Sequence, residues 1–254
     1  MDESRLHFNE DVAWEVECVG GVAGDMLLGA FLDAGADPTL IRGAFRTLGI
    51  DALALRSDRV YLAGESALHV CSAPRGKIPC GAHGVHMKDV FRILGMMGLE
   101  PAVESLARKV FSILGEAESV AHGVPFDEVH LHEVGEVDSI LDVVGVVLAY
   151  HNLGCPRLVA SSLPSGRGYV DTSHGRLSCP VPAVCEIARR FEVPLDSVEV
   201  SGETVTPTGI ALLVGLGCEF GEGIFQRYKM LGAGAGSKRF EGRANVVRIW
   251  ELAA

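Results

Sequence analysis

Two pairs of side chains that can bind a metal ion follow one another in the middle of the chain. His130 and His132 alternate, and on a β-strand residues two apart share a face. Asp138 and Asp142 are four residues apart, and on a helix such residues also share a face. A short glycine turn between the two pairs would bring imidazoles and carboxylates together. This set of donors suits a borderline divalent metal such as nickel, zinc, iron or manganese.

These four side chains also have simpler interpretations. The two histidines could be exposed strand residues, and Asp138 could serve only as the cap of the following helix. Asp142 is harder to explain in this way, because it lies within a run of isoleucine, leucine and valine. An ionised carboxylate in such surroundings needs a partner. A metal or catalytic role is therefore our working hypothesis for the cluster.

A glycine-rich turn precedes an apolar helix near the N-terminus. Gly20, Gly21 and Gly24 follow an expected strand over 12–18, and glycine allows close approach of the backbone. The helix start at Gly24 presents N–H groups to an anion, although a turn that binds nothing would contain the same glycines. Asp25 could cap this helix. It could equally be an acid at the end of the strand, where sites in α/β proteins lie.

A second helix start and a loop histidine add further candidates. Thr206 and Thr208 flank a proline at the beginning of a helix. The simpler role for Thr206 is that of the helix cap, and the alternative is a phosphate bound by the same N–H groups. His174 lies on a turn, where side chains are accessible for chemistry.

Two other patterns do not by themselves predict a site. Gly232, Gly234 and Gly236 alternate before Lys238, but the spacing is not that of a phosphate-binding loop, so a glycine-rich hairpin connection is the simpler interpretation. Cys18 is a soft ligand candidate at the end of the first strand, and a buried thiol is its default role.

The composition excludes several classes of function. The chain has 254 residues, 48% of them hydrophobic, and a net charge of −11. This balance argues against a nucleic-acid-binding surface and against docking on an anionic membrane. No secretory signal and no apolar stretch of about 20 residues is present, so we expect a cytoplasmic protein. The seven cysteines include no Cys-x-x-Cys pair, which indicates reduced thiols.

Strands and helices interleave along the chain, which predicts an α/β (α+β) fold with a mixed sheet layered with helices. We expect one domain over 1–254, and the Gly/Pro-rich stretch 73–86 is where two lobes would divide. The valines of the expected helix 138–153 leave a buried strand as an alternative. Strands are expected at 12–18, 54–62, 66–72, 128–132, 157–163, 225–233 and 244–251. Helices are expected at 26–34, 38–49, 87–98, 101–120, 138–153, 181–191 and 206–216.

Several segments, taken in order, resemble one family, the nickel insertion proteins of nickel-pincer cofactor synthesis (the LarC type). The most specific are 129–145 (VHLHEVGEVDSILDVVG) and 202–209 (GETVTPTG). The resemblance extends from about residue 13 to 250. The supporting segments are 22–30, 168–170, 173–175, 180–183, 234–236 and 245–248.

The resemblance implies insertion of Ni(II) into pyridinium-3,5-bisthiocarboxylic acid mononucleotide, a metal-inserting lyase (cyclometallase) reaction. The nickel ends bound to two sulfurs and a ring carbon. His130 and His132 would hold the metal, with Asp138 and Asp142 as further ligands or as acceptors that orient the imidazoles.

Formation of the metal–carbon bond requires the loss of a ring proton. Asp25 and His174 are the candidate bases. The N-terminal ends of two helices, one at Gly24 and one at Thr206 and Thr208, would bind the phosphate of the mononucleotide.

The sequence departs from the family pattern in two ways. Family members carry Asp-Cys-Phe-Ser-Gly where this chain has Glu-Cys-Val-Gly-Gly at 17–21. They also continue into a domain that binds CTP, in a reaction that uses manganese, whereas this chain stops at Ala254. We therefore expect the N-terminal portion alone, either as one part of a two-part enzyme with the CTP-binding domain on a separate subunit or as a divergent stand-alone protein. We expect no CTP hydrolysis by this chain.

The alternative class is a binding protein, a metallochaperone or scaffold that holds nickel or the mononucleotide precursor for a partner. A homo-oligomer is compatible with either class. A metal-dependent hydrolase is a third interpretation, and only the types of ligand support it.

Overall fold

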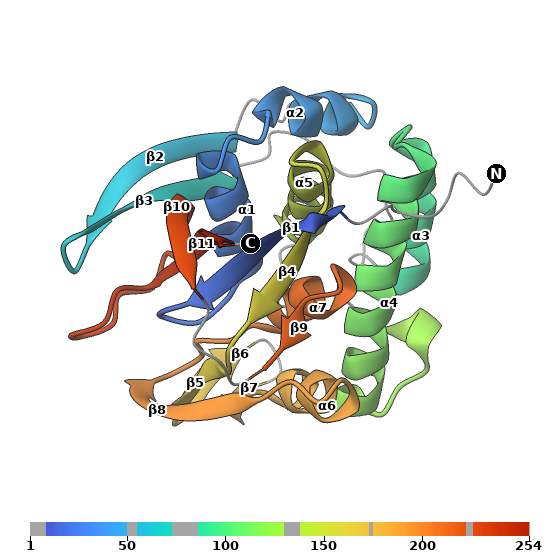
Figure 1. The fold of residues 1–254 in the computed structure, drawn as a ribbon. Coiled ribbons are helices and arrows are strands. Elements are labelled where there is room, and N and C mark those ends of the chain that lie inside the picture. Colours follow the sequence, from blue (N-terminus) through green and yellow to red (C-terminus); the bar gives the residue numbers. More distant parts are fainter. Residues whose placement is uncertain are drawn as a thin grey trace.

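The computed structural model describes residues 9–49, 55–72, 86–129, 138–172, 175–221 and 226–253. It has a large mixed sheet, two small sheets and seven helices in these ranges (Figure 1). The strands of the large sheet are β1 (Asn9–Cys18), β2 (Leu55–Leu62), β3 (Glu65–Ser72), β4 (Pro156–Ala160), β9 (Glu219–Phe220), β10 (Arg227–Ala235) and β11 (Val246–Leu252). The helices are α1 (Gly24–Asp33), α2 (Pro38–Arg46), α3 (Met87–Met96), α4 (Pro101–His122), α5 (Asp138–Asn152), α6 (Pro182–Arg190) and α7 (Pro207–Gly215).

The large sheet has the strand order β2-β3-β10-β11-β1-β4-β9. β1 pairs in parallel with β4 and antiparallel with β11, and β3 pairs antiparallel with β2 and in parallel with β10. The predicted mixed α/β architecture is therefore confirmed. Figure 1 shows β2 and β3 as a long curved hairpin at one edge of the molecule, with α4 on the opposite side.

One helix lies directly on the sheet, and further helices pack behind it. α1 contacts β3, β10 and β11, and its other side contacts α5. α5 in turn contacts α2, α4 and α7. Its valines Val143, Val144, Val146 and Val147 are all fully buried. The strand alternative for this run is thereby excluded, because burial among four helices outweighs the weak strand preference of valine.

The alternating glycines of β10 let α1 approach the strand backbone. A Cβ atom on Gly234 would lie 1.9 Å from the carbonyl oxygen of Met26, and one on Gly232 would lie 2.5 Å from that of Ala30. Gly232 and Gly234 are therefore part of a strand that a helix covers, and the hairpin-connection interpretation is wrong for these two; Gly236 does lie in the connection between the antiparallel strands β10 and β11. Helix packing, which the local pattern does not encode, requires these glycines.

Replacement of Gly234 by alanine is expected to destabilise the fold by about 1–3 kcal/mol or more, because helix and strand must separate. Gly43 is the matched control: it is exposed on α2, and a Cβ atom there would meet nothing within 4 Å. Gly43→Ala should stabilise the protein by roughly 0.5–1 kcal/mol. Urea denaturation measures both, and equal stability of the two variants would contradict this account of the packing.

Two expected strands differ from the structure. Residues 126–128 form a 3-10 turn, η2 (Phe126–Glu128), closed by hydrogen bonds onto Pro125 and Phe126, so no strand begins at 128. Residues 130–132 lie outside the described ranges. The strand expected over 157–163 is interrupted after Ala160, where the chain leaves the large sheet.

Beyond this break the chain forms the two small sheets. β5 (Leu163–Arg167) pairs in parallel with β8 (Leu195–Ser201), and β6 (Tyr169–Thr172) pairs antiparallel with β7 (Gly175–Ser178). β8 carries mostly polar, exposed side chains, which is why hydrophobic periodicity did not reveal it.

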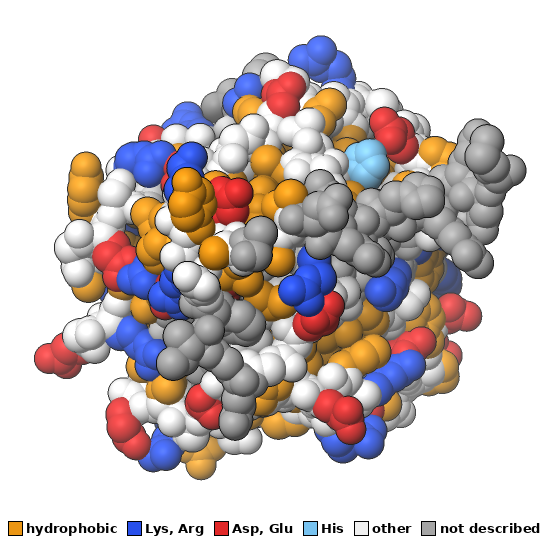
Figure 2. Space-filling model, in the orientation of Figure 1, with side chains coloured by type: hydrophobic (Ala, Val, Ile, Leu, Met, Phe, Trp, Pro, Cys, Tyr) orange, Lys and Arg blue, Asp and Glu red, His pale blue; other side chains and the backbone are white. Residues whose placement is uncertain are grey.

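The strands on either side of 73–86 belong to the same sheet, since β3 pairs with β10. Residues 73–85 themselves lie outside the described ranges. Within the ranges described, no helix combines the length and the apolar character needed to span a bilayer. On the face drawn in Figure 2, lysine and arginine side chains are interspersed with aspartate and glutamate.

Candidate functional site

Two helix starts that are far apart in the sequence lie side by side. Val22 donates its N–H to the carbonyl of Thr204 over 2.9 Å and accepts from the N–H of Thr206 over 3.0 Å. Val22 and Val205 form a parallel β-bridge. The N-termini of α1 and α7 therefore begin at adjacent points. Each contributes first-turn N–H groups and the positive end of a helix dipole.

Glycines make this approach possible. Gly21 has φ +124°, and a Cβ atom there would lie 2.0 Å from the carbonyl oxygen of Thr204. A Cβ on Gly209 would lie 2.4 Å from the carbonyl oxygen of Val22. The predicted close approach of backbone at the glycine turn is thus found, and what the turn approaches is another loop of the same chain.

The threonines of the second helix start have structural partners. The hydroxyl of Thr206 caps α7 by accepting from the N–H of Gly209 over 3.0 Å. The hydroxyl of buried Thr204 accepts from Gly166 N–H and donates to the Pro164 carbonyl oxygen. The simple cap interpretation of Thr206 is therefore confirmed. Thr208 is buried, so its only link to a ligand is its position at the start of α7.

A pocket of about 170 Å³ lies in front of the two helix starts; we call it the acidic pocket. It brings together four of the sequence-predicted site residues, Gly24, Asp142, Thr206 and Thr208. Asp142 lies so close to α1 that a Cβ atom on Gly24 would be 2.6 Å from its Oδ2. The other residues that line the pocket are Ala23, Glu118, Glu203 and Pro207.

The acidic pocket has a neighbour that the sequence analysis missed. Glu118 and His122 are four residues apart on α4, and Nε2 of His122 is 3.3 Å from Oε2 of Glu118. Glu118 lines the pocket together with Asp142. The Glu-x-x-x-His spacing was readable in the sequence as two donors on one helix face. The spacing did not indicate that α4 would place these two side chains next to α5.

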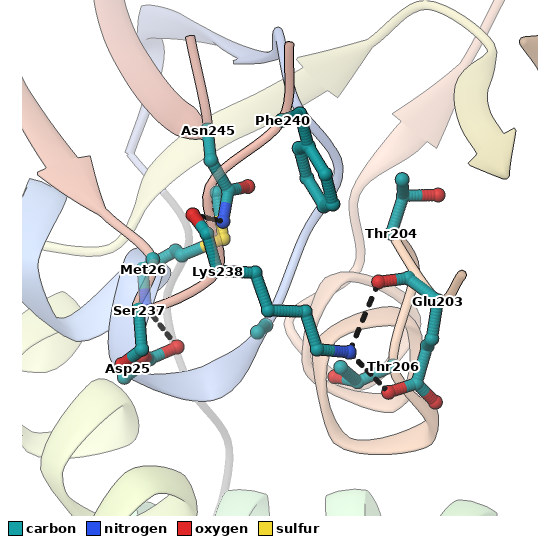
Figure 3. Close-up of a pocket in the computed structure, with 11 residues that line it drawn as sticks. Asp25, Met26, Glu203, Thr204, Thr206, Ser237, Lys238, Phe240 and Asn245 are labelled. Atoms are coloured by element: carbon teal, nitrogen blue, oxygen red, sulfur yellow. Dashed lines mark hydrogen bonds and ion pairs between the residues drawn. The ribbon is translucent and has the colours of Figure 1, made fainter. Parts of the chain in front are cut away.

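A second pocket, of about 110 Å³, adjoins the first; we call it the lysine pocket (Figure 3). Ala23, Glu203 and Thr206 line both pockets. Its distinctive lining is Asp25, Ser237, Lys238, Phe240 and Asn245. Figure 3 shows the Lys238 side chain extending across the pocket to Glu203.

Asp25 lies in the first turn of α1, so it is neither the helix cap, a position that Ala23 occupies, nor an acid at the end of β1, which ends at Cys18. Its Oδ1 accepts from the N–H of Met26 over 2.8 Å. Burial raises the pKa of the Asp25 carboxyl above its usual value. The Met26 hydrogen bond and the nearby His69 and Lys238 offset only part of this increase in pKa. A carboxylate with a raised pKa is better suited to accept a proton at neutral pH.

Comparison with known proteins shows the family to which this chain belongs. The family model described as nickel insertion protein matches residues 15–253. The chain belongs to the nickel insertion protein family. No solved structure matches it.

Curated relatives agree with this membership. A protein of Desulfotalea psychrophila that is named for nickel insertion is 42% identical over 92% of this chain. A Staphylococcus epidermidis relative, named pyridinium-3,5-bisthiocarboxylic acid mononucleotide nickel insertion protein, is 35% identical over 92% of the chain. The chain spans about three-fifths of the length of these relatives, 59% and 58% respectively.

Two predicted ligands of this family member lie outside the described residues. These are His130 and His132, and the candidate base His174 also lies outside the described residues. Asp138 is the first residue of α5, and its side chain is likewise not described. Within the described ranges, no group of three or more histidine, cysteine, aspartate or glutamate side chains is arranged to hold a metal ion. The metal site built on these residues therefore stays a prediction.

Glu17, which departs from the family pattern, and its neighbour Cys18, which matches that pattern, both have structural roles. Burial alone would raise the pKa of Glu17, but hydrogen bonds from Arg248 and Trp250 outweigh it and lower that pKa. Glu17 thus belongs to an ion-pair network on the sheet and lines neither pocket. Cys18 is buried, and burial raises the pKa of its thiol to about 12. This thiol is protonated at neutral pH, which supports its default role as a buried hydrophobe.

Proposed function

We propose that this chain carries the site at which nickel is inserted into pyridinium-3,5-bisthiocarboxylic acid mononucleotide. The observation that carries the proposal is the meeting of two unlike pockets at the starts of α1 and α7. One is lined by three carboxylates, and the other combines Asp25 with Lys238. A divalent cation and an organic anion must come together in this reaction, and the two pockets suit these two substrates.

The acidic pocket is the nickel side of the proposed site. Asp142 would act with His130, His132 and Asp138, either as a ligand or as an acceptor that orients the imidazoles. Glu118 and Glu203 add negative charge around the same space, which raises the local concentration of a divalent cation.

The helix starts are proposed to hold the thiocarboxylate end of the substrate. The sequence hypothesis assigned Gly24, Thr206 and Thr208 to the phosphate. However, Gly24 and Thr208 lie in the pocket that contains Asp142 and Glu118, where a phosphate would be repelled. A thiocarboxylate that is also bound to nickel would be shielded from these carboxylates. Its oxygen could accept from the first-turn N–H groups.

Asp25 is the proposed base. When the ring carbon bonds to nickel, its C–H bond breaks, the electron pair forms the metal–carbon bond, and the proton passes to the carboxylate. The position of Asp25 next to Gly24 and its raised pKa support this assignment. His174 stays the second candidate for the same role.

CTP and manganese are proposed to act through a separate domain. The described part of the chain offers no cradle for a triphosphate at its alternating glycines, because α1 covers Gly232 and Gly234, and Gly236 packs against Asn245. No step of the reaction is therefore assigned to CTP on this chain.

A reconstitution experiment tests the proposed function. We expect the purified chain to bind nickel and the mononucleotide, and to insert the metal only with a CTP-binding subunit, CTP and manganese. The readouts are the absorbance of the nickel product and its mass. The chain alone should hydrolyse no CTP; robust hydrolysis without a partner would show that the nucleotide site is on this chain. Absence of insertion in the complete mixture would contradict the proposal itself.

A further inference from the structure

Lys238 is the cation of the two adjoining pockets. Among the described residues that line them, it is the sole lysine or arginine, while Asp25, Glu118, Asp142 and Glu203 are acidic. Its Nζ is 3.1 Å from Oε2 of Glu203 and 3.1 Å from the backbone carbonyl oxygen of the same residue (Figure 3). An ammonium group has three donors, so two are engaged here and one is left for a ligand.

The segment that presents Lys238 is held in place by its own hydrogen bonds. The side-chain amide of buried Asn245 donates to the carbonyl oxygen of Lys238 over 3.1 Å. The hydroxyl of Ser237 is 3.1 Å from Nε2 of His69 on β3. Gly236 donates its N–H to the carbonyl of Asn245 over 3.0 Å. The backbone position of Lys238 is therefore defined before any ligand arrives, which lowers the entropic cost of binding.

Charge decides which end of the substrate this lysine receives. A mononucleotide phosphate carries up to two negative charges near neutral pH, and in the acidic pocket it would face Glu118 and Asp142. In the lysine pocket it meets a cation, beside Asp25 and the Glu203 carboxylate that the lysine contacts in this structure. We propose, resting on the proposed function above, that Lys238 anchors the phosphate of the mononucleotide, and that Glu203 holds the lysine until the phosphate replaces its carboxylate.

The exchange leaves part of the present arrangement intact. The carbonyl of Glu203 keeps its hydrogen bond with Nζ, so the ammonium group stays at the pocket while the carboxylate swings away. The released carboxylate also lines the acidic pocket. Phosphate binding thereby frees a negative charge on the nickel side.

The probe for this proposal is pyridinium-3,5-dicarboxylic acid mononucleotide, the oxygen analogue of the substrate, compared with its nucleoside, which lacks the phosphate. Titration calorimetry on the full chain, without nickel, should show tighter binding of the mononucleotide. Lys238→Met should weaken mononucleotide binding by roughly tenfold to a hundredfold and leave the nucleoside unchanged. Lys238→Arg should recover most of the loss. Glu203→Gln should tighten mononucleotide binding, because it removes the competing charge.

Matched controls and a third ligand separate the outcomes. Lys229→Met and Glu199→Gln change exposed charges outside both pockets and should alter neither affinity. Inorganic phosphate should compete only with the mononucleotide. Equal losses for nucleoside and mononucleotide in Lys238→Met, or weaker mononucleotide binding in Glu203→Gln, would overturn the proposal. A protein that binds the mononucleotide through Lys238 but inserts no nickel would contradict the proposed function alone, and one that binds neither probe would contradict both.

Discussion

Replacement of Asp25 by asparagine is expected to lower the rate of nickel insertion by roughly 10²–10⁴-fold, the usual contribution of a general base. Asparagine has the same shape and keeps an oxygen that can accept the 2.8 Å hydrogen bond from Met26 N–H. It cannot take up the ring proton. Substrate binding should therefore survive while the chemical step is lost, and single-turnover kinetics in the reconstituted mixture separate the two.

The pH dependence gives the same prediction a second readout. A base must be deprotonated to act, so the wild-type rate should rise with pH through the raised pKa of Asp25 and level off above it. The rise should lie above the usual aspartate range near 3.9. The rate of the Asp25→Asn variant should not show this rise with pH.

Stability provides the control for Asp25. The folded-state pKa of Asp25 is raised, so above its unfolded pKa the ionised carboxylate costs folding free energy. Asp25→Asn should then be neutral or slightly stabilising at pH 7, while exposed Asp58→Asn should change neither rate nor stability. A wild-type rate in Asp25→Asn would remove Asp25 from the mechanism and leave His174 as the candidate base.

Loss of nickel binding is the largest effect expected at the metal side. The double variant His130→Ala/His132→Ala should no longer bind nickel stoichiometrically, and nickel should no longer raise its melting temperature, because binding to the native state stabilises by mass action. Asp142→Asn should reduce the same nickel-dependent shift. Calorimetric titration and thermal melts with and without nickel measure both.

An indirect variant tests the geometry at Asp142. Gly24→Ala removes no donor, but its Cβ atom would lie 2.6 Å from both the Cβ and the Oδ2 of Asp142, so α1 and α5 must move apart locally and the carboxylate moves with α5. It should weaken nickel binding without changing the charge of the pocket. His151→Ala, near the far end of α5, is the matched histidine control and should bind nickel normally. Normal nickel stoichiometry in the folded double histidine variant would refute the ligand assignment.

The sequence by itself determined the local structure and the family. Thr206 was readable as a helix cap, and the structure has its hydrogen bond with Gly209. The paired strands, the long helices and the mixed sheet followed from periodicity and from glycine and proline positions, since these signals depend on neighbours within a few residues. The motif around Asp142 and the Thr-Pro-Thr-Gly segment were specific enough to indicate the nickel insertion proteins.

The tertiary structure decided which of these residues share a pocket. Val22 and Thr206 meet although 184 residues separate them, and Lys238 reaches Glu203 across 35 residues. Such contacts depend on the strand order that carries β10 beside β3 and on glycines that give α1 room, and no local pattern encodes either. Lys238 was therefore noticed only as a residue after a glycine run. The proposed placement of the phosphate changed for the same reason: the charge around each helix start is set by side chains from distant parts of the chain, and electrostatic energy depends on distance in space, not along the chain.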